Sequence, residues 1–342
     1  MGNNSSPGGR DPFFDTCKYL LIVLVIAGHV MDGYKHLYGW MEYLYSLIYL
    51  FHMPFFAFIS GYFSKRLTAR KLVSGSLLLA ESFLILHTGF LWLYNRDWPE
   101  WHAVLSPWYA PWYLLSLIWW RCAAFFCLRQ GRPVACLAIA AGIGLCSGFL
   151  YGVAEPTGFL ALSRTCLFLP FFMAGLYTTP MHVQKLRRMS HLPFAALALL
   201  TALSLVPVSG TGFNLIEYGG GFHWDTEGTA GALALFGGRL YFLSAAALLT
   251  LCLLNLLPSL RTCAGFGAKT MFFFSYHIFF VYLLNYRLRG LLHIAHPGWW
   301  YPLLGCVLTV LCLNLLSRIR LFTLLLNPVS SLASYLRRLK KA

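Results

Sequence analysis

Apolar runs of about 20 residues recur along almost the whole chain, and they constrain its fold more than any other feature. A hydrocarbon layer about 30 Å thick is crossed by a helix of roughly 20 apolar residues, whose backbone groups must hydrogen-bond within the chain. The 342 residues are 58% hydrophobic and 11% charged, which excludes an ordinary soluble domain and a disordered chain. We predict an all-α, multi-pass integral protein of the cell membrane with about ten transmembrane helices, at 17–34, 43–63, 72–94, 108–128, 133–151, 160–178, 192–208, 236–257, 270–285 and 300–316.

Charge is distributed unevenly between the predicted loops. With the N-terminus placed in the cytoplasm, most of the 26 Lys and Arg fall in cytoplasmic loops, and most acidic residues fall in the opposite loops. This is the positive-inside pattern, and it accounts for the net charge of +15 without a nucleic-acid partner. We therefore expect both termini in the cytoplasm, membrane lipids around the helices and no bound nucleic acid.

No internal repeat or long linker divides the chain, so we expect one transmembrane domain over 1–342. Its last part, 317–342, is basic and interrupted by Asn327-Pro328, which predicts a segment lying along the inner lipid headgroups. The ten cysteines lie in or beside the spans without a metal-ligand spacing such as CxxC, so we expect no metal. The glycine-rich outer loop 209–235 carries aromatic and acidic residues that suit either carbohydrate contacts or a simple connection.

Lys18 and His29 lie eleven residues apart in the first apolar run. A helix rises roughly 1.5 Å and turns roughly 100° per residue, so the two side chains share nearly the same face and lie about 16 Å apart. Ionisable groups in a spanning segment are energetically expensive and by default indicate function. We expect Lys18 near a membrane surface, His29 near the middle of the bilayer, and a site along this helix.

Further polar groups accompany the second apolar run. His52 lies two residues before Pro54, and a helix bent by proline is tolerated where it faces protein or a water-filled cavity. His52 therefore points inward, either to face a ligand or to make a packing hydrogen bond. Lys65 and Arg66 follow in SKRLTARK, a loop that either contacts lipid headgroups or, together with Lys18, holds the phosphates of an anionic cosubstrate.

Arg164 begins the sixth predicted span and Arg239 begins the eighth at a similar depth. One such arginine is typical of an anchor at the membrane surface, whereas two at one depth favour a cavity-lining pair. Asp32 follows His29 by one helical turn, where it either orients the imidazole or is exposed at the outer surface. The remaining candidates either support the site or tie helices together: Asp15, Glu81, Tyr276 and His277.

Taken in order, these landmarks resemble the membrane-bound acyltransferases of family three, and especially the branch of fucose 4-O-acetylase-like sugar O-acetyltransferases. The resemblance covers nearly the whole chain. It is carried by LLIVLVIAGHV after Asp15 and Lys18, FHMPFFAFISGYFSK, WYLLSLIWWR, SRTCLFLPFFMAG and the Tyr-His pair of the ninth run.

The resemblance implies transfer of an acyl group, usually acetyl, from cytoplasmic acyl-coenzyme A to a hydroxyl of a cell-surface or lipid-linked glycan. The family's basic residue, ten-residue gap and catalytic histidine fall on Lys18 and His29. Many members have arginine at the position of Lys18, and lysine keeps the charge but loses the bidentate fork.

The residues themselves suit this chemistry. A neutral imidazole at His29 can take the proton of a sugar hydroxyl while the hydroxyl attacks a thioester. The distance from Lys18 roughly suits an extended pantetheine arm, with the nucleotide among Lys18, Lys65 and Arg66. The groups left to hold the acceptor or stabilise the oxyanion are Arg164, Arg239, His52 and Asp32.

A transporter or exporter of a glycan or lipid-linked intermediate is the alternative, with the same groups acting in gating or proton relay. The sequence shows no inverted repeat, which weighs against it. A channel or scaffold is a second alternative, in which His29 only satisfies a helix contact. Thiol release coupled to acylation of an acceptor distinguishes an enzyme from both.

Overall fold

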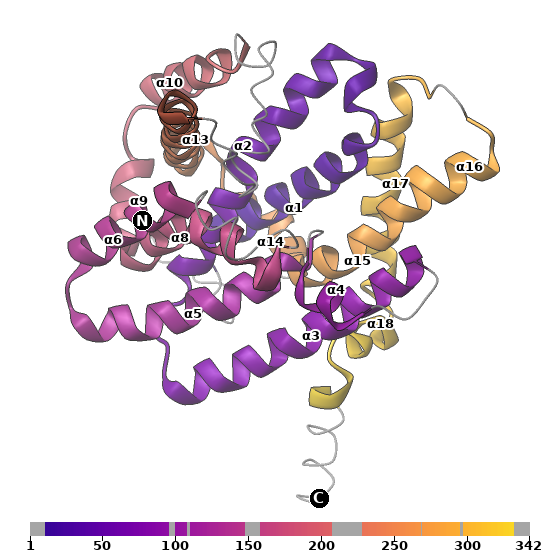
Figure 1. Ribbon diagram of the computed structural model, residues 1–342, viewed down its shortest axis with the longest axis horizontal. Coiled ribbons are helices and arrows are strands. Elements are labelled where there is room, and N and C mark those ends of the chain that lie inside the picture. Colours follow the sequence, from indigo (N-terminus) through magenta and orange to yellow (C-terminus); the bar gives the residue numbers. More distant parts are fainter. Residues whose placement is uncertain are drawn as a thin grey trace, which may run out of the picture.

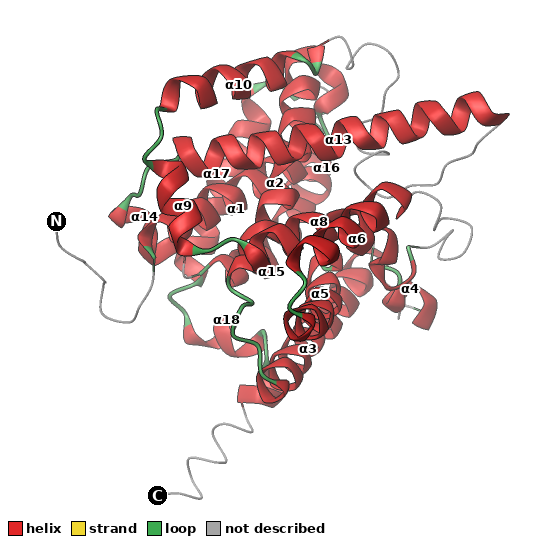
Figure 2. Ribbon diagram, turned by 90° about the vertical axis from the view of Figure 1, so that its left-hand side faces the viewer, coloured by secondary structure: helices red, strands yellow, loops and turns green. Residues whose placement is uncertain are grey.

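The computed structural model describes residues 11–95, 100–107, 110–147, 158–206, 228–267, 269–294 and 297–331. These residues form helices and connecting segments, and no strand occurs among them (Figures 1 and 2). The elements in chain order are α1 (Pro12–Asp32), η1 (Lys35–Leu37), α2 (Gly39–Tyr62), α3 (Ala69–Asn95), α4 (Trp101–Leu105), α5 (Trp112–Gln130), α6 (Pro133–Cys146), η3 (Phe159–Ala161), α8 (Leu162–Tyr177), α9 (Pro180–Arg187), α10 (His191–Leu203), α13 (Gly228–Leu256), α14 (Arg261–Gly267), α15 (Thr270–Tyr282), the π-helix η4 (Leu283–Leu288), α16 (Arg289–Leu291), α17 (Trp300–Leu316) and α18 (Arg320–Leu325).

A helix occupies each of the ten predicted positions, and the protein is a helical membrane protein. Within the described residues, five stretches are long and apolar enough to cross a membrane: α1, α2, α3, Phe159–Tyr177 and Phe236–Leu256. The shorter apolar helices are α6, α10 and α17. Large apolar side chains such as Val134 and Leu192 are almost fully exposed on the outside, as expected of a surface in contact with lipid. Crossing by all ten helices, and cytoplasmic termini, stay predictions.

Helix α1 begins before the apolar run because its first residues are strong start signals. The Asp11 carboxylate accepts a hydrogen bond from the Phe13 backbone N–H at 2.9 Å, and Pro12 occupies the first helical position. Lys18 therefore lies in the second turn of α1 and His29 in the last turn, about 25 Å from the start. His29 is thus near the far end of this helix rather than at its middle.

Helix α1 occupies the centre of the bundle, where it packs against α2, α14, α15 and α17 (Figure 1). Helices α2 and α8 cross most closely, at Gly61 and Gly175. A Cβ added to Gly61 would overlap the backbone oxygen of Phe172, and one added to Gly175 would overlap that of Phe58. The two backbones can meet only because both positions lack a side chain.

The chain after α17 returns to α3 and α15 through two side-chain ties. The Glu81 carboxylate of α3 accepts hydrogen bonds from the Val329 backbone N–H at 2.6 Å and from the Ser330 hydroxyl at 2.6 Å. The Tyr276 hydroxyl of α15 donates to the backbone oxygen of Phe322 at 2.7 Å. The described part of the predicted surface segment, 317–331, is therefore bound to the bundle, and its basic end lies outside the described residues.

Alanine at Gly175 tests the crossing of α2 and α8. The added methyl group would overlap the Phe58 carbonyl, and overpacking of this kind costs about 1–3 kcal/mol, so we expect a lower thermal unfolding midpoint in detergent. Gly89→Ala is the matched control, because a Cβ there meets no atom within 4 Å and alanine favours a helix over glycine by roughly 0.5–1 kcal/mol. A wild-type midpoint for Gly175→Ala would contradict the crossing.

Alanine at Glu81 tests the tie to the C-terminal segment. Removal of the carboxylate leaves the Val329 and Ser330 donors without their partner, so we expect the unfolding midpoint to fall. Glu100→Ala is the control, because Glu100 is exposed and its side chain makes no cap hydrogen bond. Equal midpoints for the two variants would show that Glu81 contributes nothing to stability.

Candidate active site

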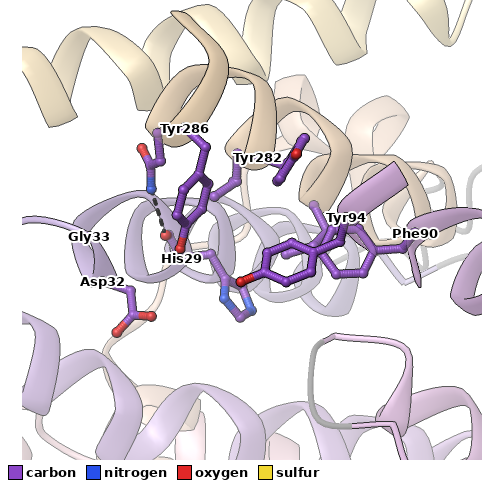
Figure 3. A pocket seen from close by; sticks show the side chains of 10 residues that line it. His29, Asp32, Gly33, Phe90, Tyr94, Tyr282 and Tyr286 are labelled. Carbon is purple, nitrogen blue, oxygen red and sulfur yellow. Dashed lines mark hydrogen bonds between the residues drawn. The ribbon is translucent and has the colours of Figure 1, made fainter. Parts of the chain in front are cut away.

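His29 lines a pocket at the far end of α1 (Figure 3). The pocket is small, with about 20 Å³ of space, roughly what one water molecule needs, and the His29 side chain is half-buried. In Figure 3 the phenols of Tyr94 and Tyr286 are turned toward the His29 imidazole. The walls of the pocket come from α1 and the residue after it, from α3, and from α15 with η4. The lining residues are His29, Asp32, Gly33, Phe90, Tyr94, Ile278, Val281, Tyr282, Asn285 and Tyr286.

Asn285 fixes the end of α1 that carries His29. The last carbonyls of a helix have no partner within it, and the Asn285 amide donates to the carbonyl of Val30 at 3.1 Å and to that of His29 at 3.5 Å. Asn285 belongs to the π-helix η4, a distortion that recurs at functional sites. The backbone beneath the His29 side chain is therefore held by a residue of a helix far away in the sequence.

His277 of α15 lies beside His29, with the two ring centroids 5.3 Å apart and the planes inclined by 39°. Its Nδ1 lies 2.7 Å from the backbone oxygen of Phe274. A carbonyl only accepts, so Nδ1 carries the hydrogen and Nε2 is an acceptor. The His277 side chain is fully buried, and its Nε2 has no hydrogen-bond partner among the residues that the structure describes.

His52 lies near His29, and the Tyr49 ring contacts both. Its Nδ1 donates to the Ile48 carbonyl at 2.6 Å, and its ring lies 4.9 Å from that of Tyr49. The Tyr49 ring lies 6.3 Å from that of His29. His52, buried among these groups, is placed by packing and a backbone hydrogen bond, while it stays within electrostatic range of His29.

Asp32 also lines the pocket, at its exposed mouth. Its carboxylate forms a salt bridge with Lys35 at 2.8 Å, and the Lys35 ammonium lies 4.4 Å from the Tyr45 ring centroid. Asp32 is thus engaged by a cation at the surface, beside the opening to His29.

The two predicted arginines lie on α8 and α13, which touch through a pair of phenylalanine rings. Arg164 precedes Phe168 by one turn and Arg239 precedes Phe242 by nearly one, and the rings of these phenylalanines lie 6.4 Å apart. The Arg239 side chain is fully buried, whereas that of Arg164 is half-buried and lies 5.6 Å from the Trp112 ring centroid.

A basic cluster occupies the opposite end of α1. Lys18 forms an ion pair with the buried Asp15, and its ammonium lies 5.5 Å from the Phe63 ring centroid. Lys65 lies over the neighbouring Tyr62 ring at 3.4 Å. The rings of Tyr62 and Phe63 are in edge-to-face contact at 5.3 Å, so one aromatic pair brings Lys18 and Lys65 together.

Two more cations adjoin this basic cluster. Arg187 of α9, which the sequence analysis missed, lies over the Phe13 ring at 3.7 Å. Arg66 is exposed in the loop after α2, next to Lys65 in the chain. Burial lowers the pKa of Lys65 to about 8, because a charged ammonium is poorly solvated there. Lys65 is therefore a cation that loses its charge in mildly alkaline solution.

The structure thus brings the sequence candidates together in two places joined by α1. At the pocket end, His277, His52 and Asp32 lie around His29. At the other end, Asp15, Lys18 and Lys65 lie close together. Glu81 and Tyr276 are engaged in helix ties instead. Among the described residues, no group of three His, Cys, Asp or Glu is placed to hold a metal ion.

The aromatic wall of the pocket was missed from the sequence. Phe90 and Tyr94 are four residues apart in α3, as are Tyr282 and Tyr286 across α15 and η4, and this spacing puts each pair on one helix face. The spacing was a signal that the sequence offered. The glycine-rich loop 209–235 gives no test of carbohydrate contacts, because 209–227 lies outside the described residues.

Comparison with known proteins gives one family and two curated relatives. The model of the family described as the acyltransferase domain, Acyl_transf_3, matches residues 11–318. Nodulation protein NolL of Mesorhizobium japonicum is 43% identical over 77 residues, and that of Sinorhizobium fredii is 39% identical over 62 residues. The matched stretch spans 20% of this chain and of the first relative, and 17% of each in the second. No solved structure matches the chain.

Proposed function

The chain belongs to acyltransferase family 3, as its motifs predicted, and on that basis we propose that it transfers an acyl group from acyl-coenzyme A to a sugar hydroxyl. The donor is acetyl-coenzyme A or another acyl-coenzyme A bound from the cytoplasm. The acceptor is an extracytoplasmic or lipid-linked carbohydrate, a cell-surface polysaccharide, oligosaccharide or glycolipid. The enzyme acts in the cell membrane.

The observation that carries the proposal is the placement of His29 and the basic cluster on one helix. Lys18 and His29 share a face of α1 about 16 Å apart, and the half-buried imidazole opens into a pocket. A long, flexible arm bearing phosphates at one end and a thioester at the other fits that separation. The nucleotide phosphates then lie among Lys18, Lys65 and Arg66.

The mouth of the pocket suits a carbohydrate acceptor. Tyr94 and Tyr286 border it with exposed rings on which the C–H face of a sugar packs, and Asp32 and Asn285 supply polar groups at the same wall. The branch of sugar O-acetyltransferases that the motifs resemble points to the same class of acceptor.

The reaction then follows the chemistry of acyl transfer. A neutral His29 imidazole takes the proton of the sugar hydroxyl as the hydroxyl oxygen attacks the thioester carbonyl. The carbonyl oxygen becomes an oxyanion, which Arg164 or Arg239 stabilises. Collapse forms the ester, breaks the carbon–sulfur bond and releases coenzyme A thiolate, which receives the proton from the His29 imidazolium.

Alanine at His29 removes the general base. General-base catalysis contributes typically 10²–10⁴-fold, so we expect kcat for thiol release in the presence of acceptor to fall by about that factor. Membrane insertion should not change. His36→Ala is the control, because His36 is an exposed histidine in η1. Wild-type thiol release by His29→Ala would exclude the base, and acceptor movement without any thiol release would favour a transporter.

The charge of Lys65 predicts a pH dependence of donor binding. Its pKa of about 8 means that the ammonium is present below pH 8 and lost above it, so kcat/KM for acyl-coenzyme A should fall as the pH rises through 8. Lys65→Arg keeps its charge over this range, so its kcat/KM should not show this part of the decline. Superimposable profiles of kcat/KM against pH for the wild type and Lys65→Arg would contradict a role of Lys65 in phosphate binding.

A further inference from the structure

We propose that His277 is a positioning residue for His29. Its Nε2 accepts the N–H of the His29 imidazole and thereby decides which His29 nitrogen is free to take the proton of the acceptor. The inference rests on the proposed role of His29 as general base.

The first step is to locate the hydrogen on the His277 ring. The Phe274 carbonyl is an acceptor, so the 2.7 Å contact requires a hydrogen on Nδ1 and leaves a lone pair on Nε2. A buried acceptor without a partner is costly, by about 1–3 kcal/mol. Nε2 is such an atom, on a side chain that is fully enclosed.

The second step is the identity of the donor. Two imidazoles joined by an N–H···N hydrogen bond of about 2.9 Å have ring centroids roughly 5 Å apart. The centroids of His29 and His277 are 5.3 Å apart, so rotation of the His29 ring can bring one of its nitrogens to Nε2. His29 has room for that rotation, because its side chain is half-buried and borders the pocket.

The third step assigns the roles of the two rings. His277 has no exposed surface and cannot reach a substrate, whereas His29 opens into the pocket. His29 is therefore the ring that meets the acceptor hydroxyl, and His277 lies behind it. When His29 has taken the proton, the N–H that it already donates to the Nε2 lone pair stabilises the imidazolium, as the third group of a catalytic triad does.

A neutral imidazole suits this interior position. A carboxylate in the same place is a charge removed from water, which is far more expensive to bury than a polar neutral group. The Phe274 carbonyl holds the Nδ1 hydrogen of His277, so the ring presents only an acceptor toward His29.

Three substitutions at His277 separate positioning from packing. Gln places an acceptor oxygen near the position of Nε2, Asn keeps only a donor near Nδ1 for the Phe274 carbonyl, and Leu keeps only the volume. We expect kcat for His277→Asn and His277→Leu to fall about 10²-fold, the usual effect of a misplaced catalytic group, with KM for acyl-coenzyme A unchanged. His277→Gln should recover at least about tenfold over His277→Leu. Ser275→Ala, a buried position on the same helix, should keep wild-type kcat.

A double variant makes the test specific. Because His277 acts only through His29, adding His277→Asn to His29→Ala should not lower the residual rate further. Wild-type kcat in His277→Asn would overturn the inference, and so would equal kcat in His277→Gln and His277→Leu. The proposed function fails separately, if His29→Ala itself keeps wild-type thiol release.

Discussion

The enclosure of α1 by other helices is the constraint on which the rest of the structure depends. Polar groups within hydrocarbon are tolerated where they face protein or a water-filled cavity. Helix α1 meets that condition, since α2, α14, α15 and α17 pack around it. It is therefore a membrane helix that can carry an ion pair near one end and an imidazole at the other, and both proposed substrates converge on it.

Close packing elsewhere holds this arrangement. The glycine crossing of α2 and α8 brings Tyr62 and Phe63 at the end of α2 to the basic cluster, while Tyr49 and His52 on the same helix adjoin His29. At the other end, Asn285 ties η4 to the last carbonyls of α1. Both ends of the site are thus set by contacts between helices rather than by loops.

Much of the helical framework was predictable, because length and hydrophobicity alone determine where membrane helices form. The grouping of Lys18 with Lys65 was predictable too, since two consecutive helices place the start of the first and the end of the second at the same end of the bundle. The start of α1 was missed although Asp11 and Pro12 are ordinary start signals, because the prediction followed apolar runs only. The sequence did not decide whether Glu81 has a structural or a functional role, since its partners lie in a segment that is distant in the sequence.

The pocket itself could not be predicted from the sequence, for two physical reasons. Tyr94 and Tyr282 belong to helices far apart in the chain, and a helix periodicity shows which residues share a face but not which faces meet. The π-helix that positions Asn285 follows from packing and has no local signal in the sequence. His277 was recognised as a candidate, but its Nε2 became meaningful only with the Phe274 contact and the neighbouring ring of His29.

The most direct test of the account is a cryo-electron microscopy structure of the full chain with a non-hydrolysable thioether analogue of acetyl-coenzyme A. We expect the phosphates beside Lys18 and Lys65, and the pantetheine arm running along α1 with the acyl-bearing carbon next to the His29 imidazole. An analogue bound with its acyl end away from His29, or with its phosphates outside the basic cluster, would contradict it.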